Sequence, residues 1–482
     1  MEQSLEWRND FEEVLRLVVE EARAYLAHVD TLPARHQNAY ADTKAIPGVM
    51  PIKGSGAAET LRELIDLSRT TTVTTSGPRC FHFVIGGSTP AALGGDWLAS
   101  LYDQLAYAWV SSPLAVQLEI ISLRWMAEMF GIPADWKSIM TTGATMSNFV
   151  GLAAGRQWVG EQLGVDVAEE GLSGLPPIPV LTSGHIHAST LKALAMLGIG
   201  RRRVERITAD NTGRLDLQDL EARLQALGGQ PAILIGTAGE PNAGAFDPIA
   251  RLADLAAQYN CWLHVDGAFG LFAGLSARTA HLVAGVEGAH SITVDGHKWL
   301  NVPYDCGFAF VCDETLLIKA FRYTAEYLPG PDDPEPVMGT IGPESSRRAR
   351  SFSVWSTLKA YGVEGYRRLI ERHLDLAQYL KSRVEEEEQL ELLADVQLNV
   401  VCFRFKPAEY NDEQLNRTNK VLGERILADG RVYVGTTTYD GKVALRPAIS
   451  NWRTEREDVD LLVKVVLELG QEVHLEMPTD KE

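Results

Sequence analysis

The sequence contains few cysteines, and their positions do not suggest a site. Its 482 residues include five of them, at Cys80, Cys261, Cys306, Cys312 and Cys402. No two are spaced as Cys-x-x-Cys. This scatter argues against a disulfide-stapled scaffold or a cysteine zinc site, and it predicts reduced thiols.

Long apolar runs and an excess of positive charge are also absent. No stretch approaches the length of apolar sequence that crosses a membrane, and residues 1–8 lack the basic and apolar sections of a secretory signal. Lysine and arginine number 45 against 64 for aspartate and glutamate, a net charge of −19. An acidic surface is poorly suited to nucleic acid or anionic membrane. We therefore expect a cytoplasmic protein that binds neither.

Strand-like and helix-like segments alternate through the middle of the chain. The strand-like segments are 179–181, 204–207, 232–236, 261–265, 292–294 and 308–311, with helical segments such as 216–227 and 248–259 between them. This alternation predicts an α/β fold in which a mainly parallel sheet lies between helices.

Three parts are expected along the chain. Residues 1–75 form a helical arm, with helices from Leu5 to about His28 and near 60–67. Residues 76–364 form a large domain that carries the alternating segments. Residues 365–482 form a small α/β domain with an antiparallel sheet; its expected elements are helices at 365–388, at 412–428 and from about Thr454, and strands at 398–405, 432–438 and 443–449.

A lysine and an acid each follow a short apolar run. Lys298 comes shortly after Ile292–Val294, and Asp266 directly follows Cys261–Val265. Open α/β sheets bind ligands at the carboxyl ends of their strands. A lysine can form a Schiff base with an aldehyde, and a carboxylate can keep a pyridine nitrogen protonated so that the ring accepts electrons. Singly, each is more often a surface charge or a helix cap, but the pair predicts a pyridoxal 5′-phosphate (PLP) site.

Several segments resemble one family, in the same order and from about Pro78 to Asn451. They are His297–Gly307 around the lysine, Ser112–Ala115 followed by Leu118-Glu119, and Thr142–Thr145 followed by Ser147-Asn148. The chain resembles the group II PLP-dependent amino acid decarboxylases, which include aromatic amino acid, histidine and glutamate decarboxylases. The resemblance implies a fold type I enzyme with a large seven-stranded-type sheet. It also implies a homodimer with active sites at the interface, joined in part by the amino-terminal arm, and an L-amino acid substrate.

The phosphate of PLP is expected at the loop Thr142–Thr145. Its small residues allow backbone N–H groups to approach an anion, and the helical run Met146–Trp158 adds the favourable charge of a helix amino terminus. By itself the segment could be an ordinary threonine-capped turn. With the lysine segment present, we expect phosphate contacts from Gly143, Ala144, Thr145 and His297. Asp295 is also placed there, although an acid beside a dianion should repel it; the alternative is that Asp295 faces a solvent-bridged partner.

The ring of PLP is expected to lie against His187, which matches the family's ring-stacking histidine. An imidazole there can clamp the ring and donate a proton near the reacting carbon. Ala268 is expected beside the ring, two residues after Asp266. The chain departs from the family at Gly239-Glu240-Pro241, where many members carry Gly-Thr-Thr, so Asn242 or Glu240 must replace the threonine as a cofactor or substrate contact.

Parts of the sequence are also compatible with two other functions. His185, His187, His264 and Asp266 could form the metal site of a hydrolase, because imidazole and carboxylate suit zinc or iron. That alternative leaves the segment 295–307 unexplained. A catalytically inactive protein with the same fold is disfavoured by the joint presence of Lys298, Asp266 and His187.

Substrate contacts are predicted at Phe81, His82, Phe83, Trp109 and Arg446. The first three fall where the family lines its side-chain pocket, although aromatic residues in a strand-like run are more often core. Arg446 resembles a small-domain arginine that receives a substrate carboxylate, a task that suits a guanidinium fork. An inter-domain salt bridge is an equal alternative for it.

The segment 329–346 matches a mobile loop that carries a proton-donating tyrosine in the family. Here it contains no tyrosine, histidine or lysine, and Tyr323 and Tyr327 stand at its entrance. A misplaced proton donor costs about 10²- to 10⁴-fold in rate. We expect decarboxylation with Tyr327 swinging in as the donor, but the loss of rate leaves room for other reactions. The alternatives are carbon–carbon lyase or aldolase chemistry and oxidative aldehyde formation, with transamination less favoured.

Overall fold

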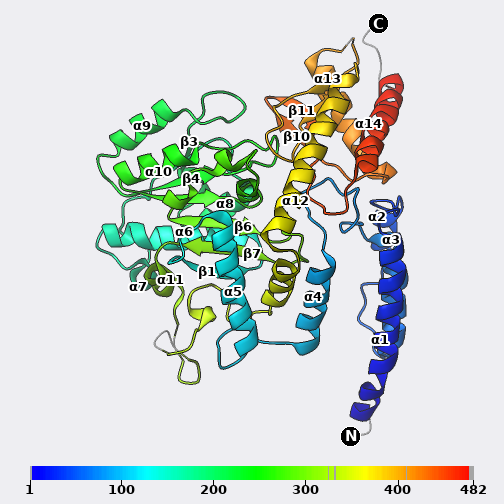
Figure 1. The fold of residues 1–482 in the computed structure, drawn as a ribbon, viewed down its shortest axis with the longest axis horizontal. Helices are drawn as coiled ribbons and strands as arrows, with labels where there is room; N and C mark the ends of the chain where they lie inside the picture. Colours follow the sequence, from blue (N-terminus) through cyan, green and yellow to red (C-terminus); the bar gives the residue numbers. More distant parts are fainter. Residues whose placement is uncertain (1–2, 324, 330–332, 409, 477–482) are drawn as a thin grey trace.

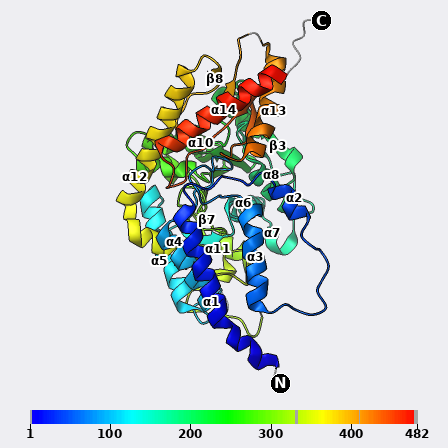
Figure 2. The same cartoon turned by 90° about the vertical axis from the view of Figure 1, so that its right-hand side faces the viewer.

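The computed structural model describes residues 3–323, 325–329, 333–408 and 410–476, and side chains from Asp10 onward. At the amino terminus, α1 (Gln3–His28) runs beside α3 (Ala57–Thr71). The short α2 (Ala39–Lys44) lies between them in the sequence. These helices stand along one edge of the molecule (Figures 1 and 2). The predicted helices at 5–28 and 60–67 are present, and α2 was not predicted.

A seven-stranded sheet, with strands in the order β1-β7-β6-β5-β4-β2-β3, forms the centre of the molecule. Neighbouring strands are parallel except that β7 is antiparallel to both β1 and β6. The strands are β1 (Lys137–Thr141), β2 (Val180–Thr182), β3 (Val204–Arg206), β4 (Ala232–Thr237), β5 (Cys261–Asp266), β6 (Ser291–Asp295) and β7 (Gly307–Val311). All but β1 were predicted, because β4 to β7 are buried throughout and read as continuous apolar runs.

Helices cover both faces of this sheet (Figure 1). On one face, α5 (Pro113–Phe130), α9 (Leu217–Ala226), α10 (Ile249–Gln258) and the start of α12 pack against Leu234, Val265 and Val294. On the other, α6 (Ala144–Gln162), α8 (Ala188–Met196) and α11 (Glu314–Phe321) pack against Ile233, Ile235 and Trp262. The remaining elements here are α4 (Pro90–Tyr102), α7 (Val167–Glu170), η1 (Arg201–Arg203), η2 (Gly270–Leu275), η3 (Ala280–Val283), η4 (Val286–Gly288) and η5 (Met338–Thr340).

The long α12 (Ser351–Glu386) runs from the central sheet to the carboxy-terminal elements (Figure 1). It begins 14 residues before the predicted helix start at 365, and it includes Gly362 with non-helical φ 60° and ψ −179°. The proposed domain boundary at 364/365 lies just after this kink. A glycine is suited to the position because side chains disfavour positive φ.

A second sheet, with strand order β10-β11-β9-β8, is antiparallel throughout. It contains β8 (Leu390–Leu392), β9 (Phe403–Phe405), β10 (Thr436–Tyr439) and β11 (Lys442–Leu445), with α13 (Asp412–Asp429) and α14 (Arg456–Glu476) packed beside it. The predicted strand 398–405 is shorter than expected, because Val400 makes only an isolated bridge to Ala448. The predicted strand 432–438 also begins too early, because β10 starts only at Thr436. Strand β8 was not predicted. Among the described helices, none combines the length and apolarity of a membrane span.

Candidate active site

A cavity of about 520 Å³ opens at the carboxyl ends of β4, β5 and β6. Eleven of the predicted site residues line it, namely Phe83, Gly143, Ala144, Thr145, His187, Asp266, Ala268, Asp295, His297, Lys298 and Arg446. They come from loops widely separated in sequence, and the sheet brings those loops to one edge. This is the edge at which open α/β sheets bind ligands.

Asp266 ends β5 at the bottom of the cavity and is 5% exposed. Its Oδ2 accepts hydrogen bonds from Thr190 Oγ1 at 2.9 Å and from Asn148 Nδ2 at 3.0 Å. Burial alone favours protonation, but the charge of Lys298 and the hydrogen bond from Thr190 oppose it, and the pKa of Asp266 is lowered. The carboxylate is therefore ionised, as required to hold a protonated pyridine nitrogen.

His187 is the N-cap of α8, where its Nδ1 accepts a hydrogen bond from Ser189 N at 3.2 Å. Burial lowers the pKa of His187, which keeps the ring neutral. Because a backbone N–H can only donate, Nδ1 is the unprotonated nitrogen, and Nε2 carries the proton. The ring can thus offer one N–H donor while its face lines the cavity.

Lys298 lies on a loop that the segment 81–87 holds in place. Gly86 N donates to His297 O at 3.0 Å, and a Cβ at Gly86 would stand 1.8 Å from Lys298 O. Only glycine fits this close approach. Lys298 Nζ lies 3.9 Å from Asp295 Oδ2 and 5.4 Å from the centre of the Phe269 ring.

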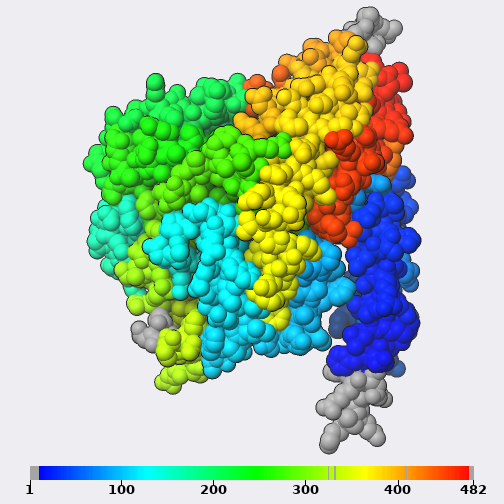
Figure 3. All heavy atoms as spheres, viewed as in Figure 1, coloured from blue at the N-terminus to red at the C-terminus, as the bar shows by residue number. Residues whose placement is uncertain are grey.

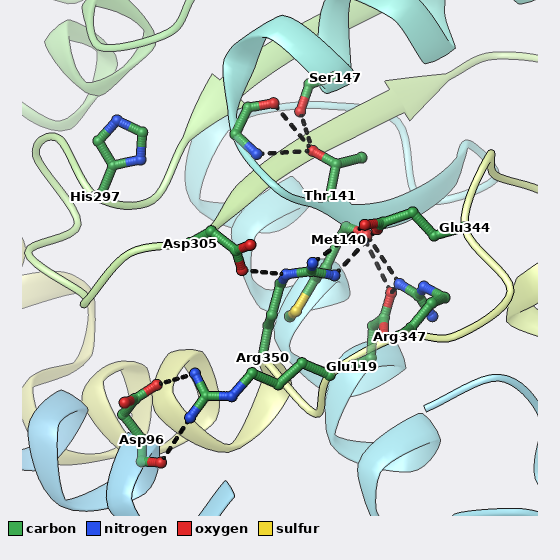
Figure 4. Close-up of polar contacts among 12 residues, drawn as sticks. Asp96, Glu119, Met140, Thr141, Ser147, His297, Asp305, Glu344, Arg347 and Arg350 are labelled. Atoms are coloured by element: carbon green, nitrogen blue, oxygen red, sulfur yellow. Dashed lines mark hydrogen bonds and ion pairs between the residues drawn. The ribbon is translucent and has the colours of Figure 1, made fainter. Parts of the chain in front are cut away.

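The loop before α6 forms a cradle with His297 and Asp295. Thr141 Oγ1 and Ser147 Oγ lie 2.7 Å apart and fix the turn (Figure 4). Gly143 has φ +138°, and a Cβ there would extend to within 3.6 Å of His297 and 3.7 Å of Asp295. The amino end of α6 points into this space, which gives a site for a phosphate group.

Arg446 directly follows β11 and reaches the cavity from the antiparallel sheet. Its Nη1 donates to Pro241 O at 3.1 Å, so it contacts the loop after β4 through a carbonyl and not through a salt bridge of 4.0 Å or less within the described residues. Burial lowers its pKa, and Glu240 opposes that effect. Glu240 is itself buried, and its carboxylate accepts from the backbone N–H groups of Asn242 and Ala243.

The other predicted site residues lie outside the cavity lining. Phe81 packs in the small-domain core, and His82 stacks on Phe83 with ring centres 3.5 Å apart. Trp109 packs against the helical layer that contains α6. Asn242 accepts from Thr437 Oγ1 at 2.6 Å and faces a neighbouring polar cleft. Tyr327 is 84% exposed.

The segment 329–346 is described only in part, since residues 330–332 lie outside the described ranges. At its entrance Tyr323 donates to Ser345 Oγ at 2.8 Å. At its far end Glu344 pairs with Arg350, whose Nε also donates to Asp305 Oδ1 at 2.7 Å (Figure 4). Glu344 is thus occupied by a structural ion pair.

The metal-site alternative is wrong for the described residues. Both ring nitrogens of His264 are bonded, Nδ1 to Ser291 Oγ at 2.8 Å and Nε2 to Asn148 Oδ1 at 2.8 Å. His185 faces the neighbouring cleft. No cluster of three or more metal-binding side chains occurs in the described ranges.

Sequence reasoning missed several cavity residues. Lys192, Thr237, Phe269 and Tyr304 all line it, and Tyr304 stacks on His297 with ring centres 4.2 Å apart. Tyr304 falls within the motif around Lys298, and Lys192 is one helical turn after Ala188, so proximity in sequence could have found both. Thr190, the second partner of Asp266, carries no sequence signal of its own.

These residues fit PLP. The cradle offers a helix amino terminus and small residues for the phosphate, Asp266 an ionised partner for the ring nitrogen, and Lys298 an amine for the aldehyde. Asp295 Oδ1 is buried and accepts no well-formed hydrogen bond within the described part of the chain. That orphaned atom faces the cradle and indicates that the space is built for a ligand.

The chain is similar in sequence and in fold to known proteins. The family profile "Pyridoxal-dependent decarboxylase conserved domain" matches residues 44–406. The aromatic-L-amino-acid decarboxylase of Bacillus atrophaeus is 30% identical over 408 residues, covering 83% of each chain. Oryza sativa TDC, crystallised with PLP and tryptamine, has a TM-score of 0.88 at 24% identity, covering 96% of this chain and 98% of that one. Mouse CSAD in its apo form has a TM-score of 0.87 at 25% identity, covering 97% and 99%.

The fold is thus fold type I, and the profile spans most of the chain, including the phosphate loop, Asp266 and Lys298. The chain belongs to the pyridoxal-dependent decarboxylase family and is a PLP-dependent amino acid carboxy-lyase.

Proposed function

We propose that this enzyme decarboxylates an aromatic L-amino acid, with Lys298 as the cofactor-bearing residue. The observation that carries the proposal is the joint placement of Lys298, Asp266 and His187 in one cavity. The relative from Bacillus atrophaeus supports the aromatic substrate class. When bound, PLP supplies an electron sink that accepts the electrons of the breaking bond between Cα and the carboxylate.

Aromatic side chains on the cavity wall also support an aromatic substrate. Phe83, Phe269 and Tyr304 all line the cavity, and Phe83 is 56% exposed, which leaves its ring open to a ligand. Arg446 is proposed to bind the α-carboxylate, because its guanidinium lines the same cavity and has no carboxylate partner within 4.0 Å in the described ranges.

The protonation states of the cavity residues determine their remaining roles. Ionised Asp266 would hold the pyridine nitrogen in its protonated form. His187, neutral and protonated on Nε2, would stack on the ring and could donate one hydrogen bond. Lys298 would hold the cofactor through its aldehyde, and its amine would serve again to return the product.

We also propose a cytoplasmic homodimer whose active sites lie near the subunit interface. Apolar residues on α1 face solvent in the single chain, including Phe11 at 67% and Leu15 at 55% exposure. Such a row of exposed apolar side chains typically marks a protein interface. The five cysteines are free thiols, as expected of a reducing compartment.

The decisive experiment measures carbon dioxide and amine from a panel of L-amino acids. We expect an aromatic amino acid to give equal amounts of both products. Lys298→Ala should abolish turnover and the absorbance near 400 nm of the lysine-linked cofactor, while Lys319→Ala, on the surface, should leave both unchanged. A Lys298→Ala protein with normal turnover would overturn the proposal, and turnover of an acidic amino acid alone would overturn the substrate class.

A second candidate is oxidative aldehyde formation, favoured by the exposed position of Tyr327. In that reaction the amino acid, one O₂ and one water give the aldehyde, carbon dioxide, ammonia and one hydrogen peroxide. If Tyr327 delivers the proton to Cα, Tyr327→Phe should lower the amine and raise the aldehyde and peroxide. An unchanged product ratio would exclude Tyr327 as the donor.

A further inference from the structure

Asp295 is an acid in a place built for an anion. Its carboxylate is 2% exposed and lies in the cradle formed by the amino end of α6 and His297. Its Oδ1 stands 3.0 Å from His297 Nδ1, yet neither atom makes a well-formed hydrogen bond in the described ranges. Two unpartnered polar atoms therefore point into the same buried space.

The charged and titratable groups around Asp295 do not balance a carboxylate and a phosphate dianion together. Lys298 Nζ is the only full positive charge within 4.0 Å of it among the described residues. Burial lowers the pKa of His297 to about 4, so the imidazole is neutral. The other neighbours that act on Asp295 or feel its charge are Asp266 from β5, Tyr304, Cys306 and the backbone N–H of Ala144 in α6.

We propose that Asp295 binds the cofactor phosphate as a neutral carboxylic acid, which donates its proton to a phosphate oxygen, so that filling the cradle takes up one proton from solvent. A protonated acid turns the repulsion between two anions into a hydrogen bond. The proposal rests on the placement of PLP described above, and it assigns to Asp295 a positioning role and no step in the reaction.

The surroundings of Asp295 within the protein already favour this protonated state. Burial, with Asp266 adding to it, raises the pKa of Asp295 to about 7, although Lys298 and two backbone N–H groups oppose the rise. A phosphate dianion raises that pKa further. Below pH 7 the acid is therefore protonated in advance, and the affinity for phosphate is independent of this group. Above pH 7 a proton must be taken up, and the affinity falls by up to about tenfold for each pH unit.

The test uses pyridoxine 5′-phosphate, which has an alcohol in place of the aldehyde and so cannot bond to Lys298. Its dissociation constant is measured by calorimetry from pH 7 to 8.5, above the second phosphate pKa of about 6. Two buffers with different ionisation enthalpies give the number of protons taken up. We expect up to about a tenfold loss of affinity per pH unit, and uptake of a proton that Asp295→Asn does not show.

Asp305→Asn is the matched control. Asp305 lies near the other end of the loop that follows Asp295, but its carboxylate turns toward Arg350 and is 44% exposed (Figure 4). The Asp305→Asn variant should keep the wild-type pH dependence. Asp295→Ser serves if Asp295→Asn fails to fold, and the wild-type proton count needs no variant at all.

Phosphorus NMR of the bound ligand locates the proton. We expect the chemical shift of a dianion, because the proton lies on Asp295. A bound monoanion, or the same pH dependence in Asp295→Asn as in the wild type, would overturn the proposal. Either result leaves the decarboxylase assignment intact, because carbon dioxide release is measured separately.

Discussion

An ionised Asp266 fixes the direction of each hydrogen bond beneath it. Trp262 Nε1 can only donate, and it does so to Ser291 Oγ at 2.9 Å. An ionised Asp266 can only accept, so Asn148 presents its N–H to Asp266 and its Oδ1 accepts from His264 Nε2–H. His264 Nδ1 is then left to accept from Ser291 Oγ. Every group in this chain of hydrogen bonds therefore has a partner.

Asn148→Leu should break this chain at its centre. It leaves His264 Nε2–H without its partner and removes one donor from Asp266, at about 1–3 kcal/mol for each unsatisfied buried group. Urea unfolding should show a loss of that size, whereas Asn211→Ala on an exposed loop should change the free energy of unfolding by less than about 0.5 kcal/mol. An equal effect of the two substitutions would show that the network does not stabilise the fold.

Motif residues such as Lys298, Asp266 and Gly143 were predictable because their chemistry is visible in the sequence. The partners of Asp266 were not. Asn148 and Thr190 lie 118 and 76 positions from Asp266, and only the folded sheet brings them together. The same reason explains Phe81, whose aromatic ring fits a pocket or a core equally well until packing decides.

At the scale of elements, one buried ion pair holds β1 to its surroundings. Arg347 Nη2 lies 2.7 Å from Glu119 Oε1, with both side chains at most 2% exposed. The same guanidinium donates to Met140 O at 2.8 Å, and Glu119 accepts from Met140 N at 2.9 Å (Figure 4). The pair therefore joins α5, β1 and the segment before α12.

Arg347→Met should destabilise the protein by about 3–5 kcal/mol, because it leaves Glu119 buried without a partner. The double variant Arg347→Met, Glu119→Met should lose less than the sum of the two single variants, since the two sites share one interaction. Thermal unfolding measures both quantities. Arg223→Met, in the exposed pair with Glu205, should change stability by about 1 kcal/mol or less, and additive effects at 119 and 347 would contradict this account.

The buried strands of the central sheet were predictable from their apolar runs, but β1 and β8 were not. Lys137–Thr141 begins with polar residues and lies at the edge of the sheet, so its apolar run is too short to stand out. Residues 351–364 were not expected to be helical, yet they form the first part of α12, which continues across Gly362. Tertiary packing against α4 and α5 decides that stretch.

At the scale of the whole molecule, the amino-terminal helices α1 to α3 form a separate layer along one side of the rest of the chain (Figure 3). The apolar pattern of α1 predicted a helix but could not show whether its apolar face is buried within the chain. In the folded chain Phe11, Leu15, Val18, Val19 and Leu26 remain exposed. We therefore propose that a second subunit buries these side chains.

Leu15→Asp combined with Val19→Asp should convert the proposed dimer into a monomer, because it places two charges in an apolar interface. Light scattering coupled to gel filtration measures the mass. Glu12→Gln, an exposed change on the same helix, should leave the mass unchanged. A native protein that already runs as a monomer, or a double variant that keeps the native dimer mass, would refute this role for α1.

The place of β1 in the sheet bears on how the enzyme is made in the cell. Among the described strands, β1 pairs only with β7, which is synthesised some 170 residues later. The phosphate loop extends directly from β1. A nascent chain that already contains Lys298 but not yet β7 therefore still lacks a fixed cradle. The order of synthesis thus places cofactor capture after β7 has been made and paired with β1.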